Sequence, residues 1–149
     1  TKQEGFPQIA IQKIDDSEYK LTQYSCLNRD SPNLWRIPIK FITDDLSVHY
    51  VLFNNKTTTI NLEKPSKWIK LNSKTIGFYR SIYSDEIFYE ILKSIKLLSV
   101  EDRYGLLDDS IQFYKATKTG FTYLADLITS MIPEYEYIII TNISEVTTQ

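Results

Sequence analysis

The sequence predicts an all-β sandwich followed by an α-helical region. Three observations carry this prediction. Apolar residues recur with a period of two from about residue 9 to 83, turn-forming residues divide this stretch into short runs, and from Ser84 the period lengthens to that of a helix. We therefore expect an antiparallel β-sandwich domain over residues 1–83 and the first helices of a truncated α-helical domain over residues 84–149.

The sandwich half contains seven runs with strand periodicity. They begin near Ile9, Tyr19, Trp35, Val48, Ile60, Trp68 and Phe78. Turn-forming segments such as Asp15-Asp16-Ser17 and Asn54-Asn55 separate them. Seven short strands with this spacing are typical of a sandwich. Pro38 lies inside the third run and cannot donate to a strand ladder, so its N side is expected at an edge or a bulge.

The last run, 78–83, is apolar on both faces although a strand of an isolated sandwich should have one wet face. We expect its second face to be covered by the helices or by a further domain. Arg80 lies on this strand and needs carboxylates or carbonyl oxygens as partners. A structural ion pair explains Arg80 more simply than a contact with substrate does.

The helical half has three segments with a spacing of three to four residues. Ser84 or Asp85 caps the first, whose apolar residues recur at helical spacing from Phe88 through Ile95 to Leu98. Ser99 opens the second, with Asp102 in the carboxylate position of a capping box. Gly120 separates the second from a third that runs to Pro133. The segment 135–143 fits a buried strand or a helix, and its helical context favours a helix.

Composition limits the classes of function. The formal net charge is -2 with Lys and Arg scattered along the chain, which argues against nucleic acid or an anionic membrane as the main partner. No apolar run approaches the roughly 20 residues that span a bilayer. Residues 1–5 are polar and lack the apolar core of a signal peptide. Two glycosylation sequons begin at Asn55 and Asn142, and chance occurrence explains them better than glycosylation does.

Candidate reactive residues are few. The single His, His49, shares a strand face with apolar residues, which favours a packed histidine over a catalytic one. The single Cys, Cys26, cannot form an internal disulfide, and as a nucleophile it would lack an orienting third group. Asp102 and Asp109 are seven residues apart, hence on one helix face, and could suggest acid–base chemistry. Capping and pairing between helices explain them better.

Four motifs in series carry a family resemblance. The first reads W-I-K-L-N followed by G-F-Y-R and a Tyr, and it comprises Trp68, Ile69, Lys70, Leu71, Asn72, Gly77, Phe78, Tyr79, Arg80 and Tyr83. The second, L-S-x-x-D-R-x-G-L-x-x-D, comprises Leu98, Ser99, Asp102, Arg103, Gly105, Leu106 and Asp109. The segments T-K-Q-E-G-F-P at the start and L-W-R-I-P-I at 34–39 are the others. Together they resemble the zinc aminopeptidases of the puromycin-sensitive and alanyl (aminopeptidase N) family.

The resemblance implies the C-terminal part of such an enzyme. In the family a zinc catalytic domain precedes a β-sandwich that leads into an α-helical superhelix, and the enzyme removes N-terminal residues from peptides. The catalytic motifs H-E-x-x-H and G-x-M-E-N are not found in this sequence. The resemblance therefore implies no catalytic and no metal residue here, with zinc held only by the parent enzyme. The partners it implies are the catalytic and remaining helical domains of the parent chain and its peptide substrates.

The sequence leaves three hypotheses. The chain, which starts without Met, is expected to be an excised spacer and chamber wall of a zinc aminopeptidase, and resemblance to the puromycin-sensitive branch favours the cytoplasm. It could instead be a stand-alone peptide- or protein-binding module, or part of an inactive family member. A helical array cut short leaves an apolar face uncovered, so self-association or modest stability is expected.

Overall fold

The computed structural model describes residues 7–25, 34–75 and 79–131. The chain divides into two compact units, Thr1–Lys93 and Ser94–Gln149. The first unit contains the strands and one helix, and the second contains the remaining helices. The compact unit that holds the strands thus extends beyond residue 83. The expected domain boundary between 83 and 84 stays a prediction.

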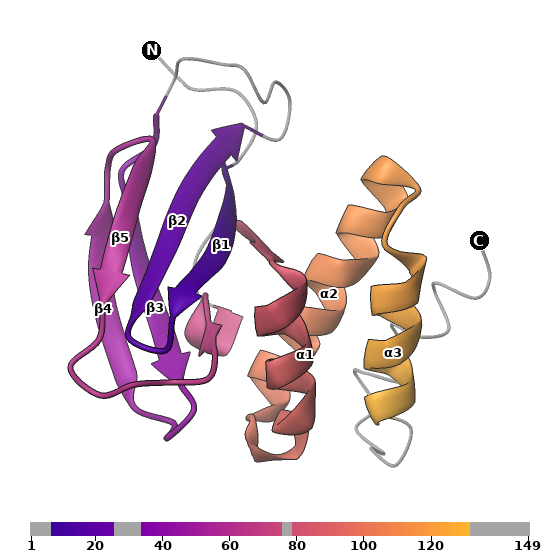
Figure 1. Cartoon of the computed structure of the whole chain (residues 1–149). Helices are drawn as coiled ribbons and strands as arrows, with labels where there is room; N and C mark the ends of the chain where they lie inside the picture. Colours follow the sequence, from indigo (N-terminus) through magenta and orange to yellow (C-terminus); the bar gives the residue numbers. More distant parts are fainter. Residues whose placement is uncertain (1–6, 26–33, 76–78, 132–149) are drawn as a thin grey trace. The chain divides into compact units, whose positions relative to one another are not determined.

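The first unit is a β-sandwich, as the sequence predicts. Its described strands are β1 (Pro7–Asp15), β2 (Glu18–Ser25), β3 (Ile37–Thr43), β4 (Val48–Phe53), β5 (Thr57–Asn61), β6 (Ile69–Lys70) and β7 (Arg80–Tyr83). They form a four-stranded sheet in the order β5-β2-β1-β7 and a three-stranded sheet in the order β4-β3-β6. Figure 1 shows these sheets as two layers, with β5, β2 and β1 in front of β3 and β4.

Strand pairing is antiparallel with one exception among the described strands. β1 and β7 run parallel, with Ile9 opposite Ser81, although the sequence predicts an antiparallel sandwich. The parallel pair arises because the chain leaves the four-stranded sheet after β5, passes through β6 in the other sheet and returns as β7. Such a crossover brings the strand back in the direction of β1, whereas a tight hairpin reverses direction.

The core of this unit lies between the sheets. Inward residues of the alternating pattern are buried, and they are Ile9, Ile11, Tyr19, Leu21, Ile37, Ile39, Phe41, Phe53 and Ile60. Pro38 is exposed and pairs with Leu52 of β4, while the described pairing of β6 with β3 covers only Ile42 and Thr43. On the β6 side, β3 is therefore an edge strand at Pro38, which is the position the sequence predicts for it.

A short 3-10 helix and one α-helix complete the first unit. The 3-10 helix η1 (Ser73–Thr75) follows β6, and α1 (Asp85–Lys93) follows β7. Ile87, Phe88 and Ile91 form the buried face of α1. The sequence predicts a longer first helix, with Ile95 and Leu98 on the same face. The α-helix instead ends at Lys93, and the chain continues as a separate 3-10 helix, η2 (Ile95–Leu97).

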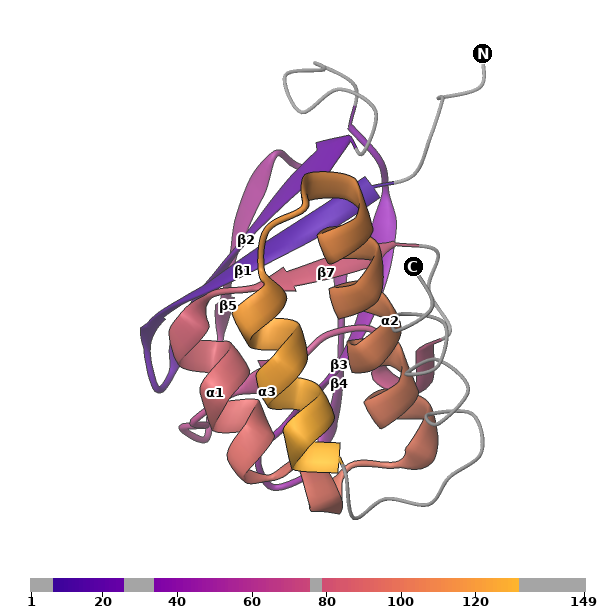
Figure 2. The same cartoon turned by 90° about the vertical axis from the view of Figure 1, so that its right-hand side faces the viewer.

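The second unit contains two α-helices, α2 (Val100–Thr117) and α3 (Phe121–Met131), in its described part. Figure 2 shows them side by side, joined by a short turn. The turn uses left-handed backbone at Lys118, with φ of 58°, and at Gly120, with φ of 77°. A Cβ atom at Gly120 would lie 3.1 Å from Cε1 of Phe113, so this turn favours glycine on two grounds. The predicted stop at Pro133 and the predicted helix at 135–143 lie outside the described residues.

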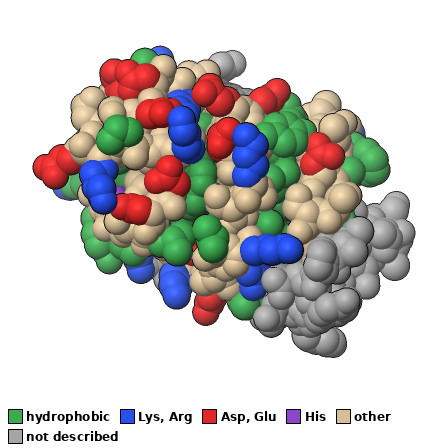
Figure 3. Space-filling view, turned by 60° about the horizontal axis from the view of Figure 1, so that its bottom comes forward, with side chains coloured by type: hydrophobic (Ala, Val, Ile, Leu, Met, Phe, Trp, Pro, Cys, Tyr) green, Lys and Arg blue, Asp and Glu red, His purple; other side chains and the backbone are tan. Residues whose placement is uncertain are grey.

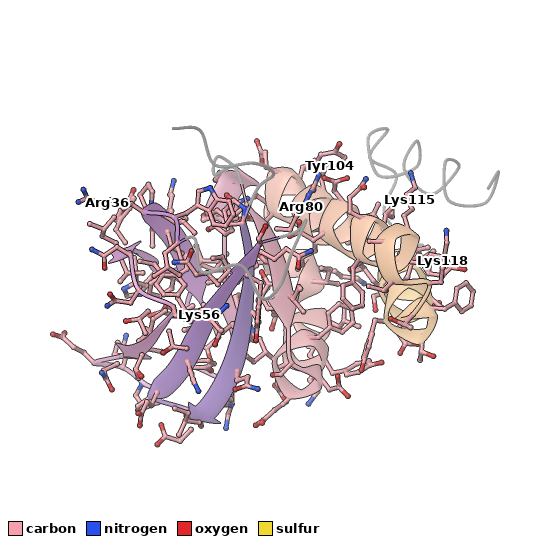
Figure 4. All side chains as sticks on the ribbon, turned by 90° about the horizontal axis from the view of Figure 1, so that it is seen from above. Arg36, Lys56, Arg80, Tyr104, Lys115 and Lys118 are labelled. Atoms are coloured by element: carbon pink, nitrogen blue, oxygen red, sulfur yellow. The ribbon has the colours of Figure 1, made fainter. Side chains whose placement is uncertain are left out.

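The surface mixes both signs of charge. Figure 3 shows Asp and Glu interspersed with Lys and Arg on one face, with hydrophobic side chains between them. In Figure 4, Lys115 and Lys118 point outward near the end of α2, where cations complement the helix dipole. None of the described helices has the length and apolar character that crossing a membrane requires.

Candidate functional site

The first sequence motif, Trp68 to Asn72, is buried and forms a short strand and turn. The Trp68 carbonyl oxygen accepts a hydrogen bond from Oγ of Ser66 at 2.5 Å. Lys70 is 1% exposed, and its Nζ donates to the carbonyl oxygen of Asn72 at 3.1 Å. Asn72 has φ of 52°, in the left-handed region that asparagine tolerates better than most residues. The motif therefore specifies local structure in the interior rather than an exposed reactive group.

The second half of this motif connects the two sheets. The hydroxyl of Tyr83, at the end of β7, accepts a hydrogen bond from the backbone N–H of Leu71, just after β6, at 3.0 Å. Tyr79 is buried and Arg80 is half-buried. Gly77 and Phe78 lie outside the described residues. The structure therefore brings the Trp68 to Asn72 segment and Tyr83 together.

Two further hydrogen-bonded groups join the sheets, and with Tyr83 we call them the sheet ties. Nε2 of Gln23, in β2, donates to the carbonyl oxygens of Trp35 at 3.1 Å and Asn55 at 2.7 Å, and Oε1 accepts from the N–H of Trp35 at 2.8 Å. The hydroxyl of Tyr19, also in β2, donates to the carbonyl oxygen of Ser66 at 2.6 Å. Desolvation by burial raises the pKa of Tyr19, so this hydroxyl stays protonated.

The L-S-x-x-D-R motif lies at the start of α2 in the second unit. Oγ of Ser99 accepts a hydrogen bond from the backbone N–H of Asp102 at 3.2 Å. The same hydroxyl donates to Oδ2 of Asp102 at 3.0 Å. The guanidinium of Arg103 donates to the carbonyl oxygen of Leu98 at 2.9 Å. Ser99 is thus the N-cap that the sequence predicts. Asp109, half-buried, lies on the same helix two turns later.

A cavity of about 510 Å³ opens beside β4 and β5 in the first unit. We call it the β4–β5 groove. It is lined by Phe41, Thr43, Asp44, Asp45, Ser47, His49, Tyr50, Val51, Thr59, Ile60, Asn61, Leu62, Glu63, Lys64 and Pro65.

His49 is a packed residue at this groove. Its ring stacks on Phe41 with centroids 5.0 Å apart and planes 16° apart, and its Nε2 lies 3.4 Å from Oγ1 of Thr43. Asp45 accepts from Oγ1 of Thr43 at 2.7 Å and from the N–H of Ser47 at 2.9 Å. Hydrogen bonds from Ser47 and Thr43 hold the pKa of the Asp45 carboxyl well below its ordinary value. Cys26 lies outside the described residues.

The residues present do not fit a zinc site of the aminopeptidase type. Such a site needs two His on one helix face and a Glu, and the whole chain has one His. Within the described ranges, no three His, Cys, Asp or Glu side chains are grouped to hold a metal ion.

Comparison with known proteins decides the family. The family model of the ERAP1-like C-terminal domain matches residues 68–149, more than half of the chain. The chain belongs to this family. The ERAP1-like C-terminal match begins at Trp68, the first residue of the buried motif, and runs from the first compact unit into the second.

The relatives that this chain matches include several aminopeptidases. The chain is 32% identical to Aminopeptidase M1-A of Oryza sativa subsp. japonica over 96% of its own length and 18% of that protein. It is 28% identical to the puromycin-sensitive aminopeptidase of Caenorhabditis elegans over 93% of its length and 16% of that protein. The chain is 27% identical to endoplasmic reticulum aminopeptidase 2 of Bos taurus over 85% of its own length and 15% of that protein. The resemblance inferred from the motifs is confirmed, and the chain spans less than a fifth of these relatives.

Sequence reasoning missed the sheet ties at Gln23 and Tyr19 and the β4–β5 groove. A signal for Gln23 was available, because it occupies an inward position in the alternation of β2 between buried residues. A polar residue at such a position requires buried partners. The groove combines residues from separate strands and loops, which no local pattern brings together.

Proposed function

We propose that this chain is a non-catalytic part of a zinc-dependent aminopeptidase and serves as a spacer and as one wall of the chamber that holds the peptide. The observation that carries the proposal is the alignment of nearly the whole chain with less than a fifth of several aminopeptidases. The catalytic and remaining helical domains of the parent are its intramolecular partners. Zinc and the peptide substrate would bind to the catalytic domain of the parent, where a zinc-bound water would be the nucleophile.

A spacer must keep its own shape, and the sheet ties support this role. Each tie is a buried or half-buried side chain of the four-stranded sheet whose hydrogen bonds reach a connecting segment next to β3 or β6 of the other sheet. Sliding of the sheets would break these bonds and leave polar groups unpaired, which is costly in an apolar interior. The sheet ties therefore favour a single relative position of the two sheets.

An activity assay of the chain and its parent tests the proposal. We expect the 149-residue chain to hydrolyse no aminoacyl-coumarin substrate and to retain no zinc after dialysis, as measured by elemental mass spectrometry. The parent should hydrolyse the substrate, contain zinc and lose activity with 1,10-phenanthroline. A parent that binds no zinc and is inactive would instead support an inactive family member. Absence of any longer parent would support a stand-alone binding module.

Two further expectations follow from the proposal. The cytoplasm is the proposed compartment, and cell fractionation with an antibody against residues of this chain tests it. Separated from the remaining helical domain of the proposed parent, the chain should self-associate as its concentration rises, because each unit of a stacked helical array covers the apolar face of its neighbour. Sedimentation showing a monomer at high concentration, together with a sharp two-state melt, would contradict the second expectation.

A further inference from the structure

We propose that the β4–β5 groove binds an extended peptide that carries a basic side chain. The ligand is a peptide of a separate molecule that joins the free edge of a strand and places an Arg or Lys side chain in the groove. The groove lies within the first compact unit, and binding there does not depend on the proposed aminopeptidase function.

The strands beside the groove both end their sheets. β4 is an edge strand of the three-stranded sheet, β4-β3-β6, and β5 is an edge strand of the four-stranded sheet, β5-β2-β1-β7. In the part of the chain that the structure describes, β4 pairs with β3 and β5 pairs with β2, so each has one free edge. Free edges present main-chain donors and acceptors that an added strand can use.

The lining residues show that the groove borders these edges. Three consecutive residues of β4, His49 to Val51, and three of β5, Thr59 to Asn61, line it. Consecutive side chains of a strand point to opposite faces. A cavity that touches three in a row therefore borders the main chain of the strand, as a peptide that adds a strand requires.

The groove also has room and an apolar lining for a side chain. Its volume of about 510 Å³ lies within the roughly 300–1,000 Å³ typical of ligand sites. Phe41 and Ile60 are buried residues of its lining, and Val51 and Leu62 are half-buried. The methylene groups of Arg or Lys can pack on such apolar surface while the charged head stays near polar groups.

The charges around the groove favour a cation. Asp44, Asp45 and Glu63 supply three carboxylates, and Lys64 supplies one ammonium group, so these four residues carry a net charge of -2 near neutral pH. Nζ of Lys64 lies 3.6 Å from Oδ2 of Asp45 and offsets part of the negative charge of that carboxylate. Asp45 keeps its charge because hydrogen bonds hold its pKa low. Glu63 is exposed, which leaves it accessible to a ligand.

The test uses the ¹⁵N-labelled 149-residue chain and three synthetic peptides. The probe is acetyl-Thr-Val-Arg-Val-Thr-amide. One matched peptide has citrulline for Arg, which keeps the shape and removes the charge, and another has N-methylated valines, which cannot donate main-chain hydrogen bonds. We expect the Arg peptide to shift the amide signals of β4 or β5. The citrulline peptide should bind roughly fivefold more weakly, and the N-methylated peptide should not bind.

Variants separate charge recognition from general attraction. Glu63→Gln should weaken binding of the Arg peptide by roughly two- to fivefold. Glu101→Gln, an exposed residue of α2, is the matched control and should leave binding unchanged. The proposal is wrong if the Arg and citrulline peptides bind equally, if the shifts map away from β4 and β5, or if no peptide binds at millimolar concentration. Activity or inactivity of a parent enzyme leaves each of these outcomes unaffected.

Discussion

The backbone N–H of Leu71 donates a hydrogen bond to the hydroxyl of Tyr83 at 3.0 Å. Leu71 follows β6 in the three-stranded sheet, and Tyr83 ends β7 in the four-stranded sheet. Because Leu71 is fully buried, water cannot replace this acceptor easily. Tyr83, the last residue of the first motif, thus has a structural role. Its hydroxyl accepts the hydrogen bond of a buried main-chain N–H in the segment Trp68 to Asn72, where the motif begins.

Replacing Tyr83 by Phe should destabilise the first unit. The change keeps the ring and removes the acceptor of a buried N–H, which costs about 1–2 kcal/mol. Urea denaturation of the 149-residue chain, followed by tryptophan fluorescence, measures the loss. Tyr50→Phe is the control, because Tyr50 is 75% exposed, and it should change stability little. Equal stability of Y83F and the unchanged chain would contradict a stabilising role for this bond.

Replacing Gln23 by Leu should have a larger effect. The apolar side chain leaves the N–H of Trp35 and the carbonyl oxygens of Trp35 and Asn55 without their partner, and we expect a loss of about 2–3 kcal/mol. Gln12→Leu, at an exposed position of the neighbouring β1, is the matched control. The midpoint of urea unfolding compares the two variants. If both shift it equally, the contribution of Gln23 is general hydrophilicity and not the sheet tie.

The strand content followed from sequence because alternation and turn chemistry are local. The runs at Ile9, Tyr19, Trp35 and Val48 became strands, and Ser99 became an N-cap. The parallel pairing of β7 with β1 was not predictable in this way, since it depends on where the chain returns after β6. The first helix ends at Lys93 although the apolar spacing continues to Leu98. The sequence pattern did not reveal this end, because a 3-10 turn preserves a similar spacing of apolar residues.

The pH dependence of stability should include a contribution from Asp45. Its pKa is lowered in the folded chain from the ordinary value of 3.8 by hydrogen bonds from Ser47 and Thr43. A lowered folded-state pKa stabilises the chain above pH 3.8 and loses this effect as pH falls toward the lower value. The difference in Tm between the unchanged chain and D45N should therefore be largest near pH 6 and shrink below pH 4. A constant difference from pH 6 to pH 2 would contradict the role of the carboxylate charge.

The N-cap of α2 offers a test in the second unit. Ser99→Ala removes the acceptor of the Asp102 N–H and should cost about 1 kcal/mol. Ser110→Ala, within the same helix, is the control and should leave stability equal or slightly higher, because Ala is the better helix former. Thermal unfolding followed by circular dichroism at 222 nm compares them. A loss for S110A as large as for S99A would contradict the capping role.

The candidate site was predictable only in part for a physical reason. Motif residues such as Trp68 and Asp102 have recognisable spacing, and their local roles follow from turn and cap geometry. The groove joins Asp45, His49 and Glu63 from a turn, a strand and a loop, and its form depends on where two edge strands end. Edge position is a property of sheet order, which alternation along one strand does not encode.

We propose above all that this chain is the non-catalytic portion of a zinc aminopeptidase. Sequencing the parent transcript upstream of Thr1 tests it most directly. We expect an H-E-x-x-H motif with a downstream Glu a few hundred residues before Thr1. A start codon close to Thr1, or a motif whose His or Glu is replaced, would contradict it and leave a binding module or an inactive relative.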